Sequence, residues 1–273
     1  MIGPMGYQLD AYLARIGKPE AGAADLATLR AVVAGHAQAI AFENLDAFTG
    51  RTPLLHLDDL AAKLVTGGRG GWCFEQNLLL RRALDDLGFR TTGLAGRVVW
   101  GRPAGAPPPP RGHMLLLVEL DEGPHVVDVG FGGLTLTGVL ALEPERAQAT
   151  PHEPFRLWPD GTGFLVQAQV GSDWTSLYRF DLGEQYLADY ELTNWYLAHH
   201  PDSHFVHTLM AARPDEGRRY ALNGRTLSVY HLDGPTERRE LSSVAEIRAA
   251  LQDQFQLDLS GLPDLDRALG RLL

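Results

Sequence analysis

The spacing of the apolar residues changes near Gly88, and this change constrains the fold more than any other feature of the chain. Before Gly88, residues such as Leu29, Val33 and Ile40 recur at helical spacing. Beyond it, short β-like runs cover residues 92–100, 114–120, 125–129 and 164–170, separated by Gly, Pro and Asp turns. The chain is therefore predicted to begin with helices and to continue as a sheet or barrel.

Turn residues divide both parts of the chain further. Helices are predicted over 26–40, over 57–64 after a Thr-Pro turn, and over 74–87, where Gly88 supplies a left-handed C-terminal cap. Four consecutive prolines make residues 102–111 a surface loop. Near the C-terminus, residues 220–231 predict a hairpin with Asn223-Gly224 at its turn, and residues 244–255 predict a closing helix.

Composition and charge exclude several classes of partner. The 273-residue chain is 45% hydrophobic, enough for a sizeable core, and its net charge of −10 would repel nucleic acid. The start MIGPMGYQLD lacks a signal-peptide pattern, and the apolar run near MLLLV is too short to cross a bilayer. A cytoplasmic protein with no membrane or nucleic-acid partner is therefore expected. The sequence indicates no oligomeric state.

The single cysteine, Cys73, excludes an internal disulfide and any zinc site that needs two thiolates. It follows a Gly-Gly pair at the start of the predicted helix 74–87, where unpaired N–H groups and the helix dipole favour a thiolate. A buried, inert cysteine is the alternative. Histidines at 199, 200, 204 and 207 have spacings that could suit zinc, but Pro201 interrupts any helix that would align them, so no metal is predicted.

His113 and Asp128 are the candidate partners of Cys73. His113 precedes an apolar strand, and histidine is the side chain best suited to take a thiol proton near neutral pH. Asp128 lies within the apolar run HVVDVGFGG, where a carboxylate requires strong hydrogen bonds such as an imidazole N–H can give. A Cys-His-Asp relay follows from these residue types. A structural role for each residue stays open on this evidence alone.

Four collinear motifs resemble those of the arylamine N-acetyltransferases, the bacterial and actinobacterial members in particular. RGGWCFEQN, residues 69–77, is similar to the family signature RGGxCxExN, and AFENL, residues 41–45, matches its FENL segment. Gly112-His113-Met114 and residues 127–132 resemble the family's histidine and aspartate motifs. The similarity continues through Trp158 and Ser203-His204-Phe205. Many members carry threonine where this chain has Gly112, so a hydroxyl contact to CoA is not expected there.

The resemblance implies an α+β fold around a papain-like Cys-His-Asp core. A helical domain over 1–88 would carry Cys73, a β-barrel domain over 89–200 would carry His113 and Asp128, and residues 201–273 would form an α/β lid. The implied reaction is a ping-pong transfer from acetyl-CoA, through an acetyl-cysteine, to an arylamine or aryl hydrazine, without a metal.

Further roles follow by matching positions. The resemblance assigns the walls of the amine pocket to Phe42, Trp100, Phe131 and Phe205. CoA contacts are assigned to Gly112, Gly132 and Gly133, because glycine lets a ligand approach the backbone closely. Glu75 is expected to form a buried ion pair with an arginine that holds the cysteine turn.

Two other functions remain compatible with the residues. The same triad serves papain-like and transglutaminase-like enzymes, so a thioester or amide hydrolase is the main alternative. A non-catalytic protein that binds acyl-CoA or an aromatic ligand is the second, although all three triad residues are present. GxSxG, HExxH and the GK[ST] ending of a phosphate loop are absent from the sequence.

Overall fold

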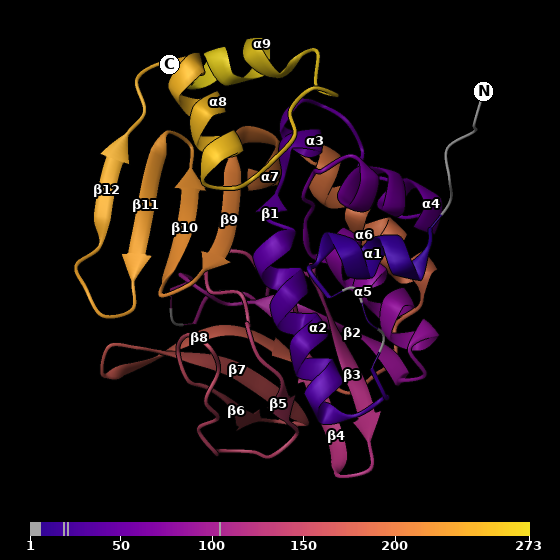
Figure 1. Ribbon diagram of the computed structural model, residues 1–273. Coiled ribbons are helices and arrows are strands. Elements are labelled where there is room, and N and C mark those ends of the chain that lie inside the picture. The colour runs from indigo at the N-terminus through magenta and orange to yellow at the C-terminus, as the bar shows by residue number, and fades with distance from the viewer. Residues whose placement is uncertain (1–6, 19, 21, 104) are drawn as a thin grey trace.

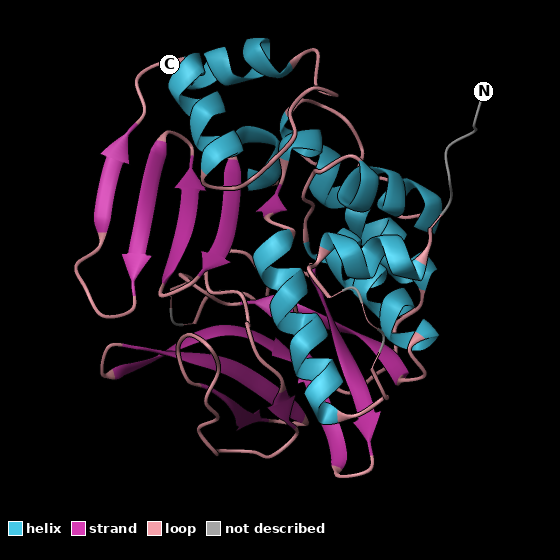
Figure 2. Ribbon diagram, viewed as in Figure 1, coloured by secondary structure: helices cyan, strands magenta, loops and turns pink. Residues whose placement is uncertain are grey.

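The computed structural model describes residues 7–18, 20, 22–103 and 105–273, which form two sheets with a group of helices packed beside them (Figure 1). Figure 2 shows that most helices gather on one side of the sheets and a second group caps the C-terminal sheet. Residues 1–6 of the N-terminal segment and residue 104 of the proline-rich loop lie outside the described residues.

In chain order the helices precede or follow the middle strands. The earlier set comprises α1 (Leu9–Arg15), α2 (Leu26–Ala39), α3 (Leu45–Phe48), α4 (Leu57–Leu60), the π-helix η1 (Ala61–Thr66) and α5 (Cys73–Asp86). The later set comprises α6 (Leu187–His199), α7 (His204–His207), α8 (Val244–Asp253), α9 (Leu265–Leu269) and the 3-10 helix η2 (Gly270–Leu272). From the later set, α6 lies beside the N-terminal helices (Figure 1).

A seven-stranded sheet of order β5-β4-β3-β2-β8-β7-β6 forms the middle of the molecule. Its strands are β2 (Arg90–Val98), β3 (His113–Leu120), β4 (Gly123–Val127), β5 (Leu140–Ala141), β6 (Phe155–Asp160), β7 (Gly163–Val170) and β8 (Asp173–Phe180). The segment that follows β5 bridges back to β6 at Pro144↔Leu157 and Gln148↔Phe155. The two edges therefore meet, and the sheet is nearly closed into a barrel around its own apolar core.

The second sheet joins the two ends of the chain. Its order is β1-β9-β10-β11-β12, built from β1 (Phe42–Glu43), β9 (Met210–Asp215), β10 (Arg218–Asn223), β11 (Thr226–His231) and β12 (Glu237–Glu240). Phe42 in β1 pairs with Ala212 in β9, so the segment before the cysteine turn is fixed by C-terminal residues.

The expected mixed helical and sheet architecture is confirmed, with local differences. Gly88 has the predicted left-handed conformation, with φ of 90°. The helix expected over 57–64 begins as α4 but continues as the π-helix η1. The hairpin turn lies one residue later than predicted: Asn223 pairs with Thr226, and Gly224-Arg225 form the loop.

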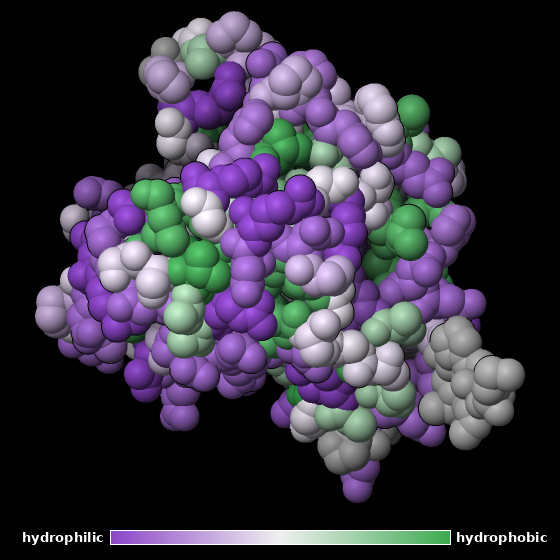
Figure 3. All heavy atoms as spheres, turned by 90° about the horizontal axis from the view of Figure 1, so that it is seen from above, coloured by the Kyte–Doolittle hydropathy of each residue, from purple (hydrophilic) through white to green (hydrophobic). Residues whose placement is uncertain are grey.

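Hydrophilic side chains dominate the face seen from above, with hydrophobic ones in separate small groups (Figure 3). Within the described part of the chain, no helix combines the length and apolarity needed to cross a bilayer.

Candidate active site

Cys73 is the first residue of α5 and is 7% exposed. Two glycines allow the preceding turn to pack closely. A Cβ on Gly70 would lie 2.1 Å from the Ala41 carbonyl oxygen, and one on Gly71 would lie 2.7 Å from a carboxylate oxygen of Glu75. Neither position has room for a side chain, which explains the Gly-Gly pair.

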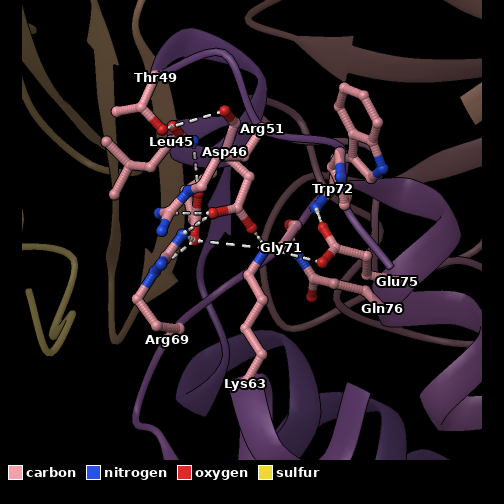
Figure 4. Close-up of polar contacts among 12 residues, drawn as sticks. Leu45, Asp46, Thr49, Arg51, Lys63, Arg69, Gly71, Trp72, Glu75 and Gln76 are labelled. Carbon is pink, nitrogen blue, oxygen red and sulfur yellow. Dashed lines mark hydrogen bonds and ion pairs between the residues drawn. The ribbon is translucent and has the colours of Figure 1, made fainter. Parts of the chain in front are cut away.

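A buried ionic cluster supports this turn (Figure 4). The Lys63 ammonium lies 2.6 Å from Glu75 Oε1 and 2.5 Å from Asp46 Oδ2. The Arg69 guanidinium lies 2.6 Å from Glu43 Oε1. The expectation that Glu75 pairs with an arginine is therefore wrong, because Arg69 is turned toward Glu43 and η1 brings Lys63 to Glu75.

Glu75 connects this cluster to the cysteine. Its Oε2 accepts a hydrogen bond from the backbone N–H of Trp72, at 3.0 Å, immediately before Cys73. Burial raises the pKa of Glu75 to about 7, although the Lys63 charge acts in the opposite direction. The carboxylates around Lys63 outweigh its burial and raise the pKa of its ammonium above the usual value. Lys63 therefore keeps its charge and partly offsets the effect of burial on the Glu75 carboxyl.

Replacing Lys63 by methionine is expected to lower the free energy of unfolding by about 3–5 kcal/mol, because it leaves buried carboxylates without their cation. Arg82→Met is the matched control, since Arg82 forms an exposed ion pair with Asp86 and should change stability only slightly. Urea denaturation of both variants measures the difference. Equal, small changes in the two variants would contradict a stabilising role for the buried cluster.

A second buried chain of hydrogen bonds reaches the turn from α1 and α2. The Tyr12 hydroxyl lies 2.9 Å from His36 Nδ1, and His36 Nε2 lies 3.2 Å from Gln76 Oε1. The Gln76 amide donates to the Gly71 carbonyl at 2.8 Å. Burial lowers the pKa of His36 to about 3. This effect of burial is larger than that of the hydrogen bond to Gln76, which raises the pKa.

This low pKa predicts a loss of stability in acid. Unfolded His36 takes up a proton near pH 6.5, whereas folded His36 stays neutral to about pH 3. The unfolding free energy should therefore fall by about 1.4 kcal/mol per pH unit from this group as the pH drops from 6.5 toward 3. Chemical denaturation at several pH values should give a shallower slope for His36→Gln than for the wild type. Identical slopes would contradict the assignment of a neutral buried histidine.

His113 and Asp128 form a buried pair beside Cys73. His113 Nε2 lies 2.7 Å from Asp128 Oδ2. The other carboxylate oxygen, Oδ1, accepts from the Asn77 amide at 3.1 Å and from the Gly130 N–H at 2.9 Å. Both carboxylate oxygens of Asp128 therefore have hydrogen-bond partners within the protein, although the side chain is buried. Its position in an apolar run requires such partners.

The thiol of Cys73 completes the group. Cys73 interacts with the His113 side chain, and because Nε2 bonds Asp128, Nδ1 is the ring nitrogen left for the sulfur. The sulfur also lies 3.8 Å from the Gly112 carbonyl oxygen. A Cβ on Gly130 would lie 2.5 Å from the Cys73 Cα, so the segment after Asp128 passes directly against the cysteine. The structure thus brings together the three residues predicted from sequence.

The electrostatics of the pair favour a charged imidazole. Burial alone lowers the pKa of His113, but the charge and hydrogen bond of Asp128, aided by Cys73, raise it to about 10. For Asp128, burial raises the pKa, and His113 together with the bonds from Gly130 and Asn77 brings it below the usual value. The proton is therefore held on His113 at neutral pH, which favours an ion pair with a cysteine thiolate.

Two predicted pocket aromatics lie close together, and one of them, Phe42, packs against the glycine segment that follows Asp128. The Phe42 and Phe205 rings are 6.4 Å apart, and Trp72 lies 5.3 Å from Phe205. A Cβ on Gly132 would lie 3.0 Å from the Phe42 ring. Trp72 joins this group without having been predicted, because its contact with Phe205 joins segments that are far apart in the sequence.

The other two predicted aromatics contact each other, and one of them also contacts the histidine. Trp100 and Phe131 are 5.7 Å apart, and Phe131 meets His113 edge-on at 5.3 Å. A Cβ on Gly133 would lie 2.7 Å from the Trp100 ring. Gly132 and Gly133, both at positive φ, therefore let the segment pass close to two aromatic rings.

Sequence reasoning also missed Tyr178 in β8. It is 1% exposed, and its ring centroid lies 4.6 Å from that of His113. Burial and the charge of Asp128 raise the pKa of its hydroxyl well above the usual value, so it stays protonated. The strand carries no motif at this position, so no sequence signal distinguishes Tyr178 from ordinary core.

The histidines near 200 hydrogen-bond to other groups of the protein, and His199 Nε2 lies 3.1 Å from the Thr52 hydroxyl oxygen. His199 Nδ1 contacts the Trp195 carbonyl, and His207 Nε2 contacts the Pro201 carbonyl. Searching the described residues finds no group of three or more His, Cys, Asp or Glu side chains placed to hold a metal ion.

Comparison with known proteins identifies the class to which this fold and site belong. A family model described as N-acetyltransferase matches residues 25–263. The arylamine N-acetyltransferase of Mycolicibacterium smegmatis is 42% identical over 266 residues, covering 96% of each chain. That of Escherichia coli (strain K12) is 43% identical and covers 91% of this chain and 88% of its own.

Solved structures agree. The M. smegmatis arylamine N-acetyl transferase superposes with a TM-score of 0.94 at 41% identity, covering 97% of this chain and 98% of its own. The Mycobacterium marinum arylamine N-acetyltransferase in complex with CoA gives 0.93 at 40% identity, with the same coverage. This chain belongs to the arylamine N-acetyltransferase family.

Proposed function

We propose that the protein transfers an acetyl group from acetyl-CoA to an arylamine or aryl hydrazine through the sulfur of Cys73. The observation that carries this proposal is the buried His113–Asp128 pair, 2.7 Å apart, against the first residue of α5. Membership of the family supplies the donor and the class of acceptor.

The proposed reaction has two halves. The Cys73 thiolate attacks the thioester carbonyl carbon of acetyl-CoA, and the tetrahedral intermediate collapses with cleavage of the bond to the CoA sulfur. Protonated His113 gives its proton to the departing CoA thiolate, which leaves acetyl-Cys73 and neutral imidazole. The amine then attacks the acetyl carbonyl, His113 accepts an amine proton, and the amide departs as the Cys73 thiolate is restored. Asp128 stabilises the imidazolium in both halves.

The layout expected from the family is part of the same proposal. Residues 1–88 would contribute the cysteine, 89–200 the histidine and aspartate, and 201–273 a lid, around a papain-like core. Gly112, Gly132 and Gly133 are assigned to CoA, because their backbone groups lie beside the sulfur and the aromatic rings. The cytoplasmic location stays a prediction.

Acceptor choice separates the transferase from the hydrolase with the same triad. Phe42, Phe131 and Phe205 are proposed to bind the aromatic ring of the acceptor in a site from which water is excluded. With acetyl-CoA fixed, the rate with an aryl hydrazine should exceed both the rate with an aliphatic amine and hydrolysis without any amine. Double-reciprocal plots should be parallel. CoA release that is equally fast without amine would favour the hydrolase.

Phe205→Ala should raise the KM for the aryl hydrazine by roughly tenfold, because a ring contact made equally in ground and transition states contributes uniform binding. Acetyl-enzyme formation should stay close to the wild-type rate. Phe164→Ala, in the separate contact between Phe164 and Phe180, is the control for the loss of a phenylalanine. An unchanged KM in Phe205→Ala would remove this residue from the amine site.

A further inference from the structure

The AFENL segment contains a buried polar side chain, Asn44, to which the proposed reaction gives no role. Asn44 is 2% exposed and stands at the N-cap position of α3. An asparagine at this position usually accepts a hydrogen bond from an N–H in the first turn of its own helix. Here Glu43 serves the first N–H of the helix, because its Oε2 accepts from Leu45 at 2.6 Å. The Asn44 side chain is turned to a different segment.

That segment carries Phe205. The Asn44 amide nitrogen donates to the carbonyl oxygens of Phe205 and Thr208, each at 2.8 Å, and its Oδ1 accepts from the Met210 N–H at 2.7 Å. Both amide hydrogens and the oxygen are thereby used. The two carbonyls belong to the C-terminal end of α7, where a helix leaves its own carbonyls without donors. Asn44 therefore fixes α7 against the end of β1, although 161 residues separate it from Phe205.

Aromatic neighbours surround the Phe205 ring near the reactive cysteine. The ring centroid lies 5.3 Å from that of Trp72, which directly precedes Cys73, and 6.4 Å from that of Phe42. Phe205 is itself only partly buried, so part of the residue stays open to a ligand. Because Asn44 holds the backbone of this residue, the position of α7 decides how the ring stands beside the cysteine turn.

We propose that Asn44 is a positioning residue for the acceptor, which holds the Phe205 ring at the separation from Phe42 that an aromatic amine requires. This inference rests on the proposed function, because it takes Phe205 to bind the acceptor ring. With four residues, α7 is too short to be stable alone, so its place depends on bonds from outside. A gap of about 0.5–1 Å already removes a quarter to a half of a dispersion contact, so a small shift of α7 weakens ring binding.

Steady-state kinetics of Asn44→Ala test the proposal. The KM for an aryl hydrazine should rise roughly three- to tenfold, no more than the loss of the Phe205 ring itself causes, because a contact made equally in ground and transition states is weakened. The KM for an aliphatic amine and the rate of acetyl-enzyme formation should stay near their wild-type values. Gln167→Ala is the matched control, since it removes another buried amide, which bonds Arg156 and Ser176 in the barrel, and should change none of these quantities.

A double-mutant cycle separates positioning from a general structural role. If Asn44 acts through Phe205, adding Asn44→Ala to Phe205→Ala should raise the KM no further, whereas independent effects would multiply. Circular dichroism verifies that each variant is folded. Asn44→Ser replaces the alanine variant if that protein does not fold. Serine is a good N-cap for α3, and its oxygen stands where the asparagine Cγ stands, one bond short of the carbonyls of α7.

Three results would overturn the positioning role. These are effects of Asn44→Ala and Phe205→Ala that multiply, a wild-type KM for the aryl hydrazine in a folded Asn44 variant, and equal losses in acetyl-enzyme formation and hydrazine binding. Failure of the proposed function is distinguishable from all three. In that case the wild type would form no acetyl-Cys73, or Phe205→Ala alone would leave the KM unchanged.

Discussion

Asp128→Asn is expected to leave the fold intact and to reduce turnover by about 10³- to 10⁴-fold. The reason lies in the two sides of the carboxylate. Oδ1 accepts from the Asn77 amide and the Gly130 N–H, so the oxygen of an asparagine must take that position. Its amide nitrogen then faces His113 Nε2 as a donor. The neutral imidazole must then carry its proton on Nδ1. This nitrogen therefore cannot accept the proton of the Cys73 thiol.

Steady-state kinetics and circular dichroism of Asp128→Asn measure this effect. Asp121→Asn, the same change at an exposed position in the turn between β3 and β4, is the control and should retain wild-type turnover. A folded Asp128→Asn protein with near wild-type turnover would remove Asp128 from the proposed triad.

The second large effect concerns the reactivity of Cys73. In the wild type, alkylation by iodoacetamide should be fast and nearly independent of pH across the neutral range, because His113, with a pKa of about 10, holds the proton. His113→Ala should slow alkylation at pH 7 by roughly 10- to 100-fold and make the rate rise toward alkaline pH. The raised pKa of His113 also predicts the upper pH limit of the ion pair between His113 and Cys73, because His113 loses its proton as the pH passes about 10.

His125→Ala is the matched control for that experiment. His125 is buried in β4, where its Nδ1 lies 2.8 Å from the Gly123 carbonyl oxygen. Its loss should not alter the alkylation profile. Equal alkylation profiles in the wild type and His113→Ala would contradict activation of the thiol by His113.

The architecture was predictable where a local pattern decides the structure. The change of apolar spacing at Gly88 separates helices from sheet, and Gly88 itself takes the left-handed conformation that ends α5. Strand β12 was not predictable, because Glu237–Glu240 are all exposed polar residues whose strand conformation depends on pairing with β11. The same holds for β1, two residues long, which pairs with a strand far along the chain.

In the candidate site too, features set by a local pattern were predictable and features set by distant contacts were not. Cys73, His113 and Asp128 lie at the ends of elements that the sequence defines, and the motifs distinguish them from structural residues. Lys63 lies in a helical segment where a lysine is usually solvated, so nothing local indicates that it meets Glu75. The π-helical turn of η1 and its packing beside α5 bring Lys63 and Glu75 together.

The measurement that tests the central claim most directly is intact-mass spectrometry of the protein after incubation with acetyl-CoA and no amine. The account predicts the addition of one acetyl group, located on Cys73 by peptide mapping, absent from Cys73→Ala and removed when an aryl hydrazine is added. Unmodified protein that nevertheless acetylates the hydrazine, or an acetyl group on another residue that is transferred to the amine, would contradict acetyl transfer through Cys73.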